Sequence, residues 1–175
     1  EASIFISHTH WDHIQGFPFF VPAYIRGNHV RLHGPHGAGK SFEEVFRGLM
    51  EPSYFPVDLG DMAAKVEFVE MKGTPIEYGG VAVTTAFTNH PGMDLAYRFS
   101  VDGKSVVYLT DHENYQTMNQ PSDFARKQDR LIEEFCSGAD ILVADAQYTD
   151  EEYRAKRTWG HSRYQDTVEL ALSAG

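Results

Sequence analysis

The sequence predicts a mixed α/β fold in a single domain over residues 1–175. Of its residues, 42% are hydrophobic and 23% are charged, which is ordinary for one globular domain with its own core. Short apolar runs with the character of strands alternate along the chain with segments that open like helices. No apolar run reaches the roughly eighteen residues of a membrane span, and no internal repeat is visible.

Seven apolar segments have the character of strands: 2–7, 28–33, 65–71, 81–88, 95–101, 105–110 and 140–145. Asp102 and Gly103 supply a tight turn between two of them, which predicts a hairpin.

Four helices are expected, opening at Ser41, Ser122, Thr149 and Ser162. Ser41 and Glu44 form a capping box, and this first helix ends before Pro52. Ser162 with Gln165 is expected to cap the last helix. That helix is expected to turn four apolar side chains towards the core: Val168, Leu170, Ala171 and Leu172.

The chain is acidic, with a formal net charge of -10. Such a chain is a poor non-specific binder of nucleic acid, although bound divalent metals can reverse the sign locally. Cys136 is the single cysteine, which excludes an internal disulfide and fits a reducing compartment. We therefore expect a cytoplasmic protein in which Cys136 is a buried structural thiol.

The densest chemistry lies in residues 8–16, which read H-T-H-W-D-H-I-Q-G. Alternate residues of an extended segment point the same way, so His8 and His10 can approach one metal ion together. Asp12 and His13 follow as the backbone turns, and can reach a second ion or orient a water. Imidazole with carboxylate suits zinc and tolerates manganese or iron. The alternative is a solvated loop, which the close spacing and the lack of nearby Lys or Arg disfavour.

Two more candidate ligands directly follow predicted strands. His90 comes after 81–88 and Asp111 comes after 105–110, which places both at a sheet rim where functional loops gather. Alone, His90 would be read as a turn histidine; beside the first motif, metal binding is favoured. His112 and Glu113 follow Asp111, and either solvent exposure or hydrogen bonding near the site is expected for them.

The pattern H-x-H-x-D-H followed by Gly16 resembles the signature of metallo-β-lactamase-fold hydrolases. It is nearer to the phosphodiesterase and ribonuclease Z branch, since di-iron relatives usually carry Glu where this chain has His10. The resemblance implies a four-layer αββα sandwich, with two sheets face to face and helices outside, incomplete at both ends. Proteins of this family have strands before the first motif and a further metal-binding His after the last helix. We therefore expect this chain to be an internal fragment that lacks both.

The resemblance also implies two divalent metal ions, zinc being favoured over manganese or iron. One ion would take His8, His10 and His90. The other would take Asp12, His13 and the His absent from this chain. Asp111 would bridge both ions, because a shared carboxylate damps the repulsion between them.

The segment Trp159-Gly160-His161-Ser162 resembles the [A/G]-H-S segment of ribonuclease Z-like enzymes. The matching histidine there assists the phosphorus centre and the leaving group, so His161 is a catalytic candidate. In those enzymes the histidine is held by a carboxylate at the position that matches Asp145. Here this group is Asp in place of the commoner Glu, one methylene shorter, which makes its contact with His161 less secure. The alternative is that His161 only packs or caps at the start of the helix.

Together these residues predict a dinuclear phosphodiesterase in which a metal-bridging hydroxide attacks phosphorus and Asp12 takes up a proton. Ribonuclease Z-type enzymes carry a long tRNA-gripping arm between the strand-end His and the bridging Asp, whereas only 21 positions separate His90 from Asp111. We therefore expect a small-molecule phosphodiester or cyclic nucleotide as substrate, with no nucleic acid or membrane partner. Thioester or lactone hydrolysis and a non-catalytic metal-binding regulatory domain remain the alternatives, and the oligomeric state stays open.

A second motif needs weighing against this one. Residues 34–41, G-P-H-G-A-G-K-S, match the phosphate-binding pattern G-x-x-x-x-G-K-[ST] letter for letter. Gly34-Pro35-His36 predicts a rigid turn, and no acidic partner of the kind such sites use is evident. A nucleotide triphosphate site is therefore disfavoured.

Overall fold

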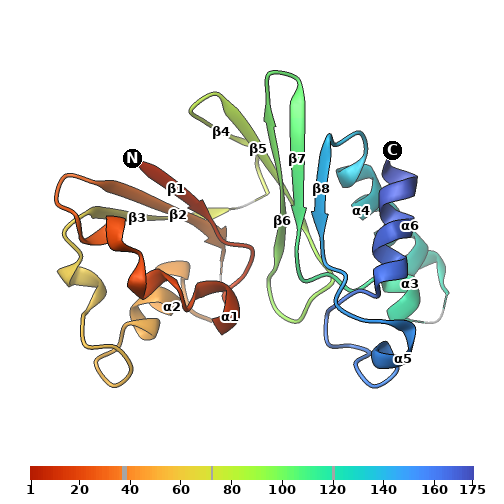
Figure 1. The fold of residues 1–175 in the computed structure, drawn as a ribbon, viewed down its shortest axis with the longest axis horizontal. Coiled ribbons are helices and arrows are strands. Elements are labelled where there is room, and N and C mark those ends of the chain that lie inside the picture. Colours follow the sequence, from red (N-terminus) through yellow and green to blue (C-terminus); the bar gives the residue numbers. More distant parts are fainter. Residues whose placement is uncertain (37–38, 72, 120) are drawn as a thin grey trace. The chain divides into compact units, whose positions relative to one another are not determined.

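The structure, a computed structural model, describes residues 1–36, 39–71, 73–119 and 121–175. These residues form two compact units, Glu1–Lys72 (unit 1) and Gly73–Gly175 (unit 2) (Figure 1). The single domain expected over residues 1–175 stays a prediction, because two compact parts can belong to one folding domain or to two.

Unit 1 is built on a three-stranded parallel sheet in the order β1-β2-β3. The strands are β1 (Ala2–Phe5), β2 (His29–Pro35) and β3 (Lys65–Met71), so all three strands predicted in this part of the chain are present. The connections hold short helical turns: α1 (Trp11–Ile14), η1 (Phe17–Phe19), η2 (Val21–Tyr24) and η3 (Leu59–Asp61). The four metal-binding candidates of this unit lie in the first connection, shortly after β1: His8, His10, Asp12 and His13.

Helix α2 (Phe42–Leu49) follows β2, and its predicted capping box is confirmed. The Ser41 side chain accepts from the Glu44 backbone N–H at 3.2 Å, and the Glu44 carboxylate accepts from the Ser41 N–H at 2.6 Å. The helix buries Phe42 and Phe46 in the core of unit 1. Phe17 packs edge-on against Phe46, with ring centroids 5.0 Å apart, which fixes the chain just after the candidate metal loop.

The phosphate-binding pattern at residues 34–41 begins in the last two residues of β2 and ends at Ser41, the N-cap of α2. The rigid turn predicted at Gly34-Pro35-His36 is therefore wrong for Gly34 and Pro35, which pair with β3. The flanking strand and helix are thus better formed than the sequence indicated. The middle of the pattern, residues 37–38, lies outside the described residues. A nucleotide site there stays disfavoured by the sequence.

Unit 2 is built on a five-stranded mixed sheet in the order β4-β5-β6-β7-β8. Its strands are β4 (Ile76–Tyr78), β5 (Val81–Phe87), β6 (Leu95–Val101), β7 (Lys104–Leu109) and β8 (Ile141–Ala144). Four of them match predicted strands, and the three-residue β4 was not predicted. Asp102 and Gly103 make the predicted tight turn, both with positive φ (50° and 73°), as a type I′ hairpin requires.

Four helices complete unit 2: α3 (Tyr115–Met118), α4 (Asp123–Cys136), α5 (Asp150–Tyr153) and α6 (Tyr164–Ala174). Figure 1 shows α4 and α6 together on one side of the sheet. They cover a core of small and apolar side chains: Ala96, Val107, Leu109, Ile132, Cys136 and Ala174. Cys136 is buried as predicted, and burial raises the pKa of its thiol to about 11, so it is an inert packing residue.

The predicted cap of α6 is wrong. Arg163 occupies the cap position, with its backbone N–H donating to the Asp166 carboxylate at 3.3 Å. The Ser162 hydroxyl instead donates to the backbone carbonyl of His112. Gln165 reaches outward to Asp150, to which its amide donates at 3.1 Å.

The predicted core face of α6 is wrong at three of its four positions. Val168 and Leu172 are 54% and 78% exposed, and Ala171 is also exposed, whereas Leu170 does pack on the core. The buried stripe runs through Asp166, Leu170 and Ala174, which lie four residues apart and so share a face. The buried carboxylate of Asp166, which accepts hydrogen bonds from Arg163 and from the Thr117 hydroxyl, is part of this stripe.

Among the residues that the structure describes, no helix has both the length and the apolar character needed to cross a membrane.

Candidate metal centre

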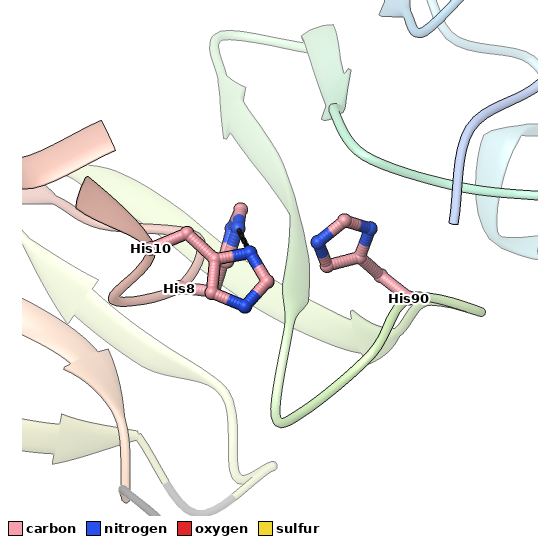
Figure 2. Close-up of side chains that lie close together, drawn as sticks. All are labelled: His8, His10 and His90. Atoms are coloured by element: carbon pink, nitrogen blue, oxygen red, sulfur yellow. Dashed lines mark hydrogen bonds between the residues drawn. The ribbon is translucent and has the colours of Figure 1, made fainter. Parts of the chain in front are cut away.

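The first motif forms a compact histidine group in unit 1. His8 Nε2 and His10 Nδ1 lie 2.9 Å apart, as the dashed line in Figure 2 shows. His8 is buried, and its other ring nitrogen lies 3.1 Å from the Ser7 hydroxyl. The His8 and His13 rings are also in contact, with centroids 4.2 Å apart. The structure thus brings His8 and His10 together, and their binding to one metal ion stays a prediction.

Asp12 and His13 lie on the single turn of α1. The Asp12 carboxylate is 73% exposed and lies 3.2 Å from His13 Nε2. An exposed carboxylate beside an imidazole can serve as a ligand or as a proton acceptor without the desolvation penalty of a buried charge. The geometry fits either of the roles predicted for Asp12.

The sheet of unit 2 brings three predicted residues to one edge. Strands β5 and β7 are both antiparallel to β6, and β8 is parallel to β7. All three strands therefore end at the same edge, and the segments after them carry His90, Asp111 and Asp145 respectively. His90 lies in the loop that follows β5 (Figure 2).

Two of these side chains, His90 and Asp111, form a ligand group within unit 2 together with His161. His90, Asp111 and His161 each offer one ligand atom, and these atoms lie within 4.8 Å of one another. His90 Nε2 is 3.7 Å from Asp111 Oδ2. Two imidazoles and a carboxylate are a donor set that zinc and related divalent ions accept, so these residues fit the metal that the resemblance implies.

Asp145 contacts His161 directly despite its shorter side chain. Its Oδ2 lies 2.8 Å from His161 Nδ1 and also accepts from the backbone N–H of His112 at 3.2 Å. Oδ1 accepts from the Gln147 N–H at 3.1 Å. The carboxylate thus holds the proton on Nδ1 of His161, which leaves Nε2 for a ligand or a substrate.

His90 is oriented by a backbone carbonyl. Its Nδ1 lies 2.9 Å from the carbonyl oxygen of Gly160, which can only accept, so Nδ1 carries the proton and Nε2 is left to bind a metal. Gly160 has φ of 87°, and a Cβ at this position would lie 2.3 Å from His90 Nδ1. Only glycine therefore allows this close approach.

His112 and Glu113 are the residues near the site that the sequence did not resolve. Both are buried, 5% and 1% exposed, so the expectation of solvent exposure is wrong and that of hydrogen bonding is right. His112 Nδ1 accepts from the Asn89 backbone N–H at 3.1 Å. Nothing in the local sequence marks these two side chains as buried, because their partners lie far along the chain.

Burial of His112 predicts a pH-dependent stability. Burial lowers the pKa of His112 from its ordinary 6.5 to about 4, so between these values the unfolded chain binds more protons than the folded chain. Its contribution to the free energy of unfolding is complete above pH 6.5 and is lost as the pH falls towards 4, by on the order of 3 kcal/mol. Urea unfolding of the metal-free chain should show this loss. His112→Asn, whose amide oxygen can accept the same bond, should show a flatter dependence; equal slopes would refute this account.

Comparison with known proteins identifies the family. A family profile described as a beta-lactamase superfamily domain matches residues 2–175. The chain belongs to the metallo-β-lactamase superfamily. The predicted resemblance is confirmed, and so is the mixed α/β fold class of this metallo-β-lactamase superfamily domain.

Curated relatives of this superfamily member carry the name ribonuclease Z. The protein of that name from Haloferax volcanii is 25% identical over 207 residues, covering 99% of this chain and 65% of the relative. That from Exiguobacterium sibiricum is 24% identical, covering 99% of this chain and 68% of the relative. The chain thus spans about two thirds of the length of these relatives.

Solved structures share the fold at lower identity. The metallo-beta-lactamase fold protein YhfI from Bacillus subtilis aligns with a TM-score of 0.67 at 18% identity, covering 99% of this chain and 60% of the other. Human tRNase Z, short form, aligns with a TM-score of 0.63 at 18% identity, covering 98% of this chain and 68% of the other. A diphosphatase from the PhnP family aligns with a TM-score of 0.60 at 23% identity, covering 98% of this chain and 56% of the other. At these identities the likeness concerns the fold alone.

The complete ligand set of this metallo-β-lactamase superfamily domain stays a prediction. Unit 1 brings its own candidates together, and unit 2 does the same with His90 and Asp111. His161 lies among the latter, closer to the ligand group than the sequence indicated.

Proposed function

We propose that this chain carries the active site of a dinuclear metal-dependent hydrolase that cleaves a small phosphodiester. The observation that supports this most is the placement of His90 and Asp111, the proposed ligands, whose donor atoms lie within 4.8 Å of each other and of His161, the proposed proton donor. Membership of the metallo-β-lactamase superfamily supports a metal-dependent hydrolase more generally. The relatives named ribonuclease Z favour a phosphodiester as the bond that is cleaved.

Six side chains would hold two divalent ions, zinc being favoured: His8, His10, Asp12, His13, His90 and Asp111. When bound, such ions acidify a water and neutralise the charge on phosphate oxygens. The protein's part is to supply ligands in a fixed orientation. The Gly160 carbonyl does this for His90 by holding the proton on Nδ1.

Proton transfer is assigned to two residues. Asp12, exposed beside His13, would accept a proton from the attacking water. His161 would deliver a proton from Nε2 to the departing oxygen, while Asp145 keeps its Nδ1 proton in place at 2.8 Å.

Charge and spacing support a small substrate, such as a cyclic nucleotide, over tRNA. The net charge of -10 opposes a polyanion. Only 21 positions separate His90 from Asp111, and β6 and β7 occupy most of them. We place this activity in the cytoplasm because a sequence with the single cysteine Cys136 forms no internal disulfide, which fits a reducing compartment.

Parallel assays would test this function. Hydrolysis of bis(p-nitrophenyl) phosphate, of a thioester and of a lactone is measured with zinc or manganese and after chelation, in this chain and in any longer protein that contains it. We expect metal-dependent cleavage of the phosphodiester in preference to the other two. Faster thioester or lactone cleavage would replace the proposal with that chemistry. Metal binding without any hydrolysis would favour a regulatory domain, and tight, salt-sensitive tRNA binding would overturn the small substrate.

A further inference from the structure

Glu113 is a buried carboxylate without a role in the proposed proton transfers. Its side chain is 1% exposed and accepts three hydrogen bonds. Oε1 accepts from the Tyr153 hydroxyl and from the Thr158 backbone N–H, the latter at 2.9 Å. Oε2 accepts from the Gly160 backbone N–H, also at 2.9 Å. Both carboxylate oxygens are thus used to hold residues 153–160.

These residues form the loop that lies against His90 and leads directly into His161. The loop turns through left-handed backbone at Thr158 (φ 73°) and Gly160 (φ 87°). Left-handed backbone is unfavourable for Thr, so the surrounding contacts must hold it there. The two backbone bonds to Glu113 fall on these same two residues.

The backbone of Glu113 is hydrogen-bonded to Asn89, the residue before His90. Its N–H donates to the Asn89 carbonyl at 3.0 Å, and its carbonyl accepts from the Asn89 amide at 2.7 Å. Asn89 is the residue before His90, and Gly160 is the residue whose carbonyl contacts His90 Nδ1. One residue therefore ties down both the segment that carries His90 and the group that orients its ring.

We infer that Glu113 is a positioning residue that sets the tautomer of His90 and the placement of His161. The inference rests on the proposed function in taking His90 as a metal ligand. Glu113 acts through the loop: its carboxylate fixes the Gly160 N–H, the Gly160 carbonyl then meets His90 Nδ1, and Nε2 is left for the metal. Buried partners of this kind typically change metal affinity about 10- to 100-fold when removed.

Glu113→Gln is the main test. Gln has the shape of Glu, but its NH2 group replaces one carboxylate oxygen, and an NH2 group cannot accept the backbone N–H bond that this oxygen accepts. Asp129→Asn is the matched control. The Asp129 carboxylate also accepts three hydrogen bonds. The backbone N–H of Tyr115 donates at 2.8 Å, and the backbone N–H and the side-chain amide of Gln116 each donate at 3.0 Å. These bonds anchor α3 instead of the loop beside His90. Tyr153→Phe removes one bond to Glu113 and leaves the carboxylate intact.

Two readouts separate positioning from stability. Long-range 1H–15N NMR of the imidazoles reports the tautomers of His90 and His161, and calorimetric titration with Zn2+ alone reports metal affinity. In Glu113→Gln we expect loss of the single Nδ1–H tautomer of His90 and about 10-fold weaker Zn2+ binding or more. Tyr153→Phe should change the His90 tautomer and the Zn2+ affinity in the same direction but by less. Asp129→Asn should change neither the tautomer nor the affinity.

The inference is overturned if Glu113→Gln keeps the His90 tautomer and binds Zn2+ within about twofold of the parent chain. It is also overturned if Asp129→Asn produces the same changes. If Glu113→Gln does not fold, Glu113→Asp decides, because its shorter side chain draws the carboxylate away from Thr158 and Gly160; an unchanged His90 tautomer and Zn2+ affinity in that variant refute the role. Neither readout needs turnover, so a chain that hydrolyses no phosphodiester would refute the proposed function and leave this inference standing.

Discussion

Asp111→Ala is expected to lower phosphodiester hydrolysis by about 1,000-fold or more and to lower the amount of metal bound. Asp111 would bridge both ions, and it is the carboxylate of the ligand group in unit 2. Losing it removes a negative charge that offsets the repulsion between two dications. Turnover of bis(p-nitrophenyl) phosphate and metal content by elemental analysis, on the same preparations, would measure both effects.

Asp123→Asn is a suitable control for this prediction. Asp123 is an exposed carboxylate in the first turn of α4, paired only with Arg126 among the described ion pairs. Its loss changes the net charge by the same amount without touching the candidate site. Unchanged turnover and metal stoichiometry in Asp111→Ala would rule out the bridging role.

Phe46→Ala is expected to destabilise the fold by about 3–5 kcal/mol. Phe46 is fully buried and packs against three other rings, those of Phe17, Phe42 and Phe68. Truncation leaves a cavity that these stiff neighbours cannot fill. Urea unfolding followed by fluorescence would measure the loss.

Tyr54→Ala serves as the comparison for Phe46→Ala. The Tyr54 side chain is 70% exposed, so its removal should change the free energy of unfolding by no more than about 0.5 kcal/mol. A similar cost for both substitutions would show that Phe46 does not hold the core of unit 1.

The strands and the residues at their ends were predictable because their signals are local. The apolar runs of β5, β7 and β8 are visible in the sequence, and each is followed at once by a polar segment with a candidate residue. Strand direction then brings those segments to one edge. The turn at Asp102 and Gly103 and the capping box at Ser41 are equally local, since each depends on residues within a few positions.

The buried polar residues were not predictable for the opposite reason. Glu113 is stabilised by Thr158 and Gly160, which are 45 and 47 positions away. No rule of periodicity reports such a contact. In α6, the apolar character of Val168 and Leu172 predicted that they face the core, whereas the structure exposes both and buries Asp166. In both cases a partner lies far along the chain, since the Asp166 carboxylate also accepts from the Thr117 hydroxyl, 49 positions away.

Asp111 also holds left-handed backbone, with φ of 48°. This conformation costs an ordinary residue about 1 kcal/mol or more and costs glycine almost nothing. Replacement by glycine would relax the backbone just after β7 while deleting the carboxylate that we propose as a metal ligand. Directed evolution for heat tolerance alone would therefore tend to discard this carboxylate, and a library built on this chain needs selection for catalysis in every round.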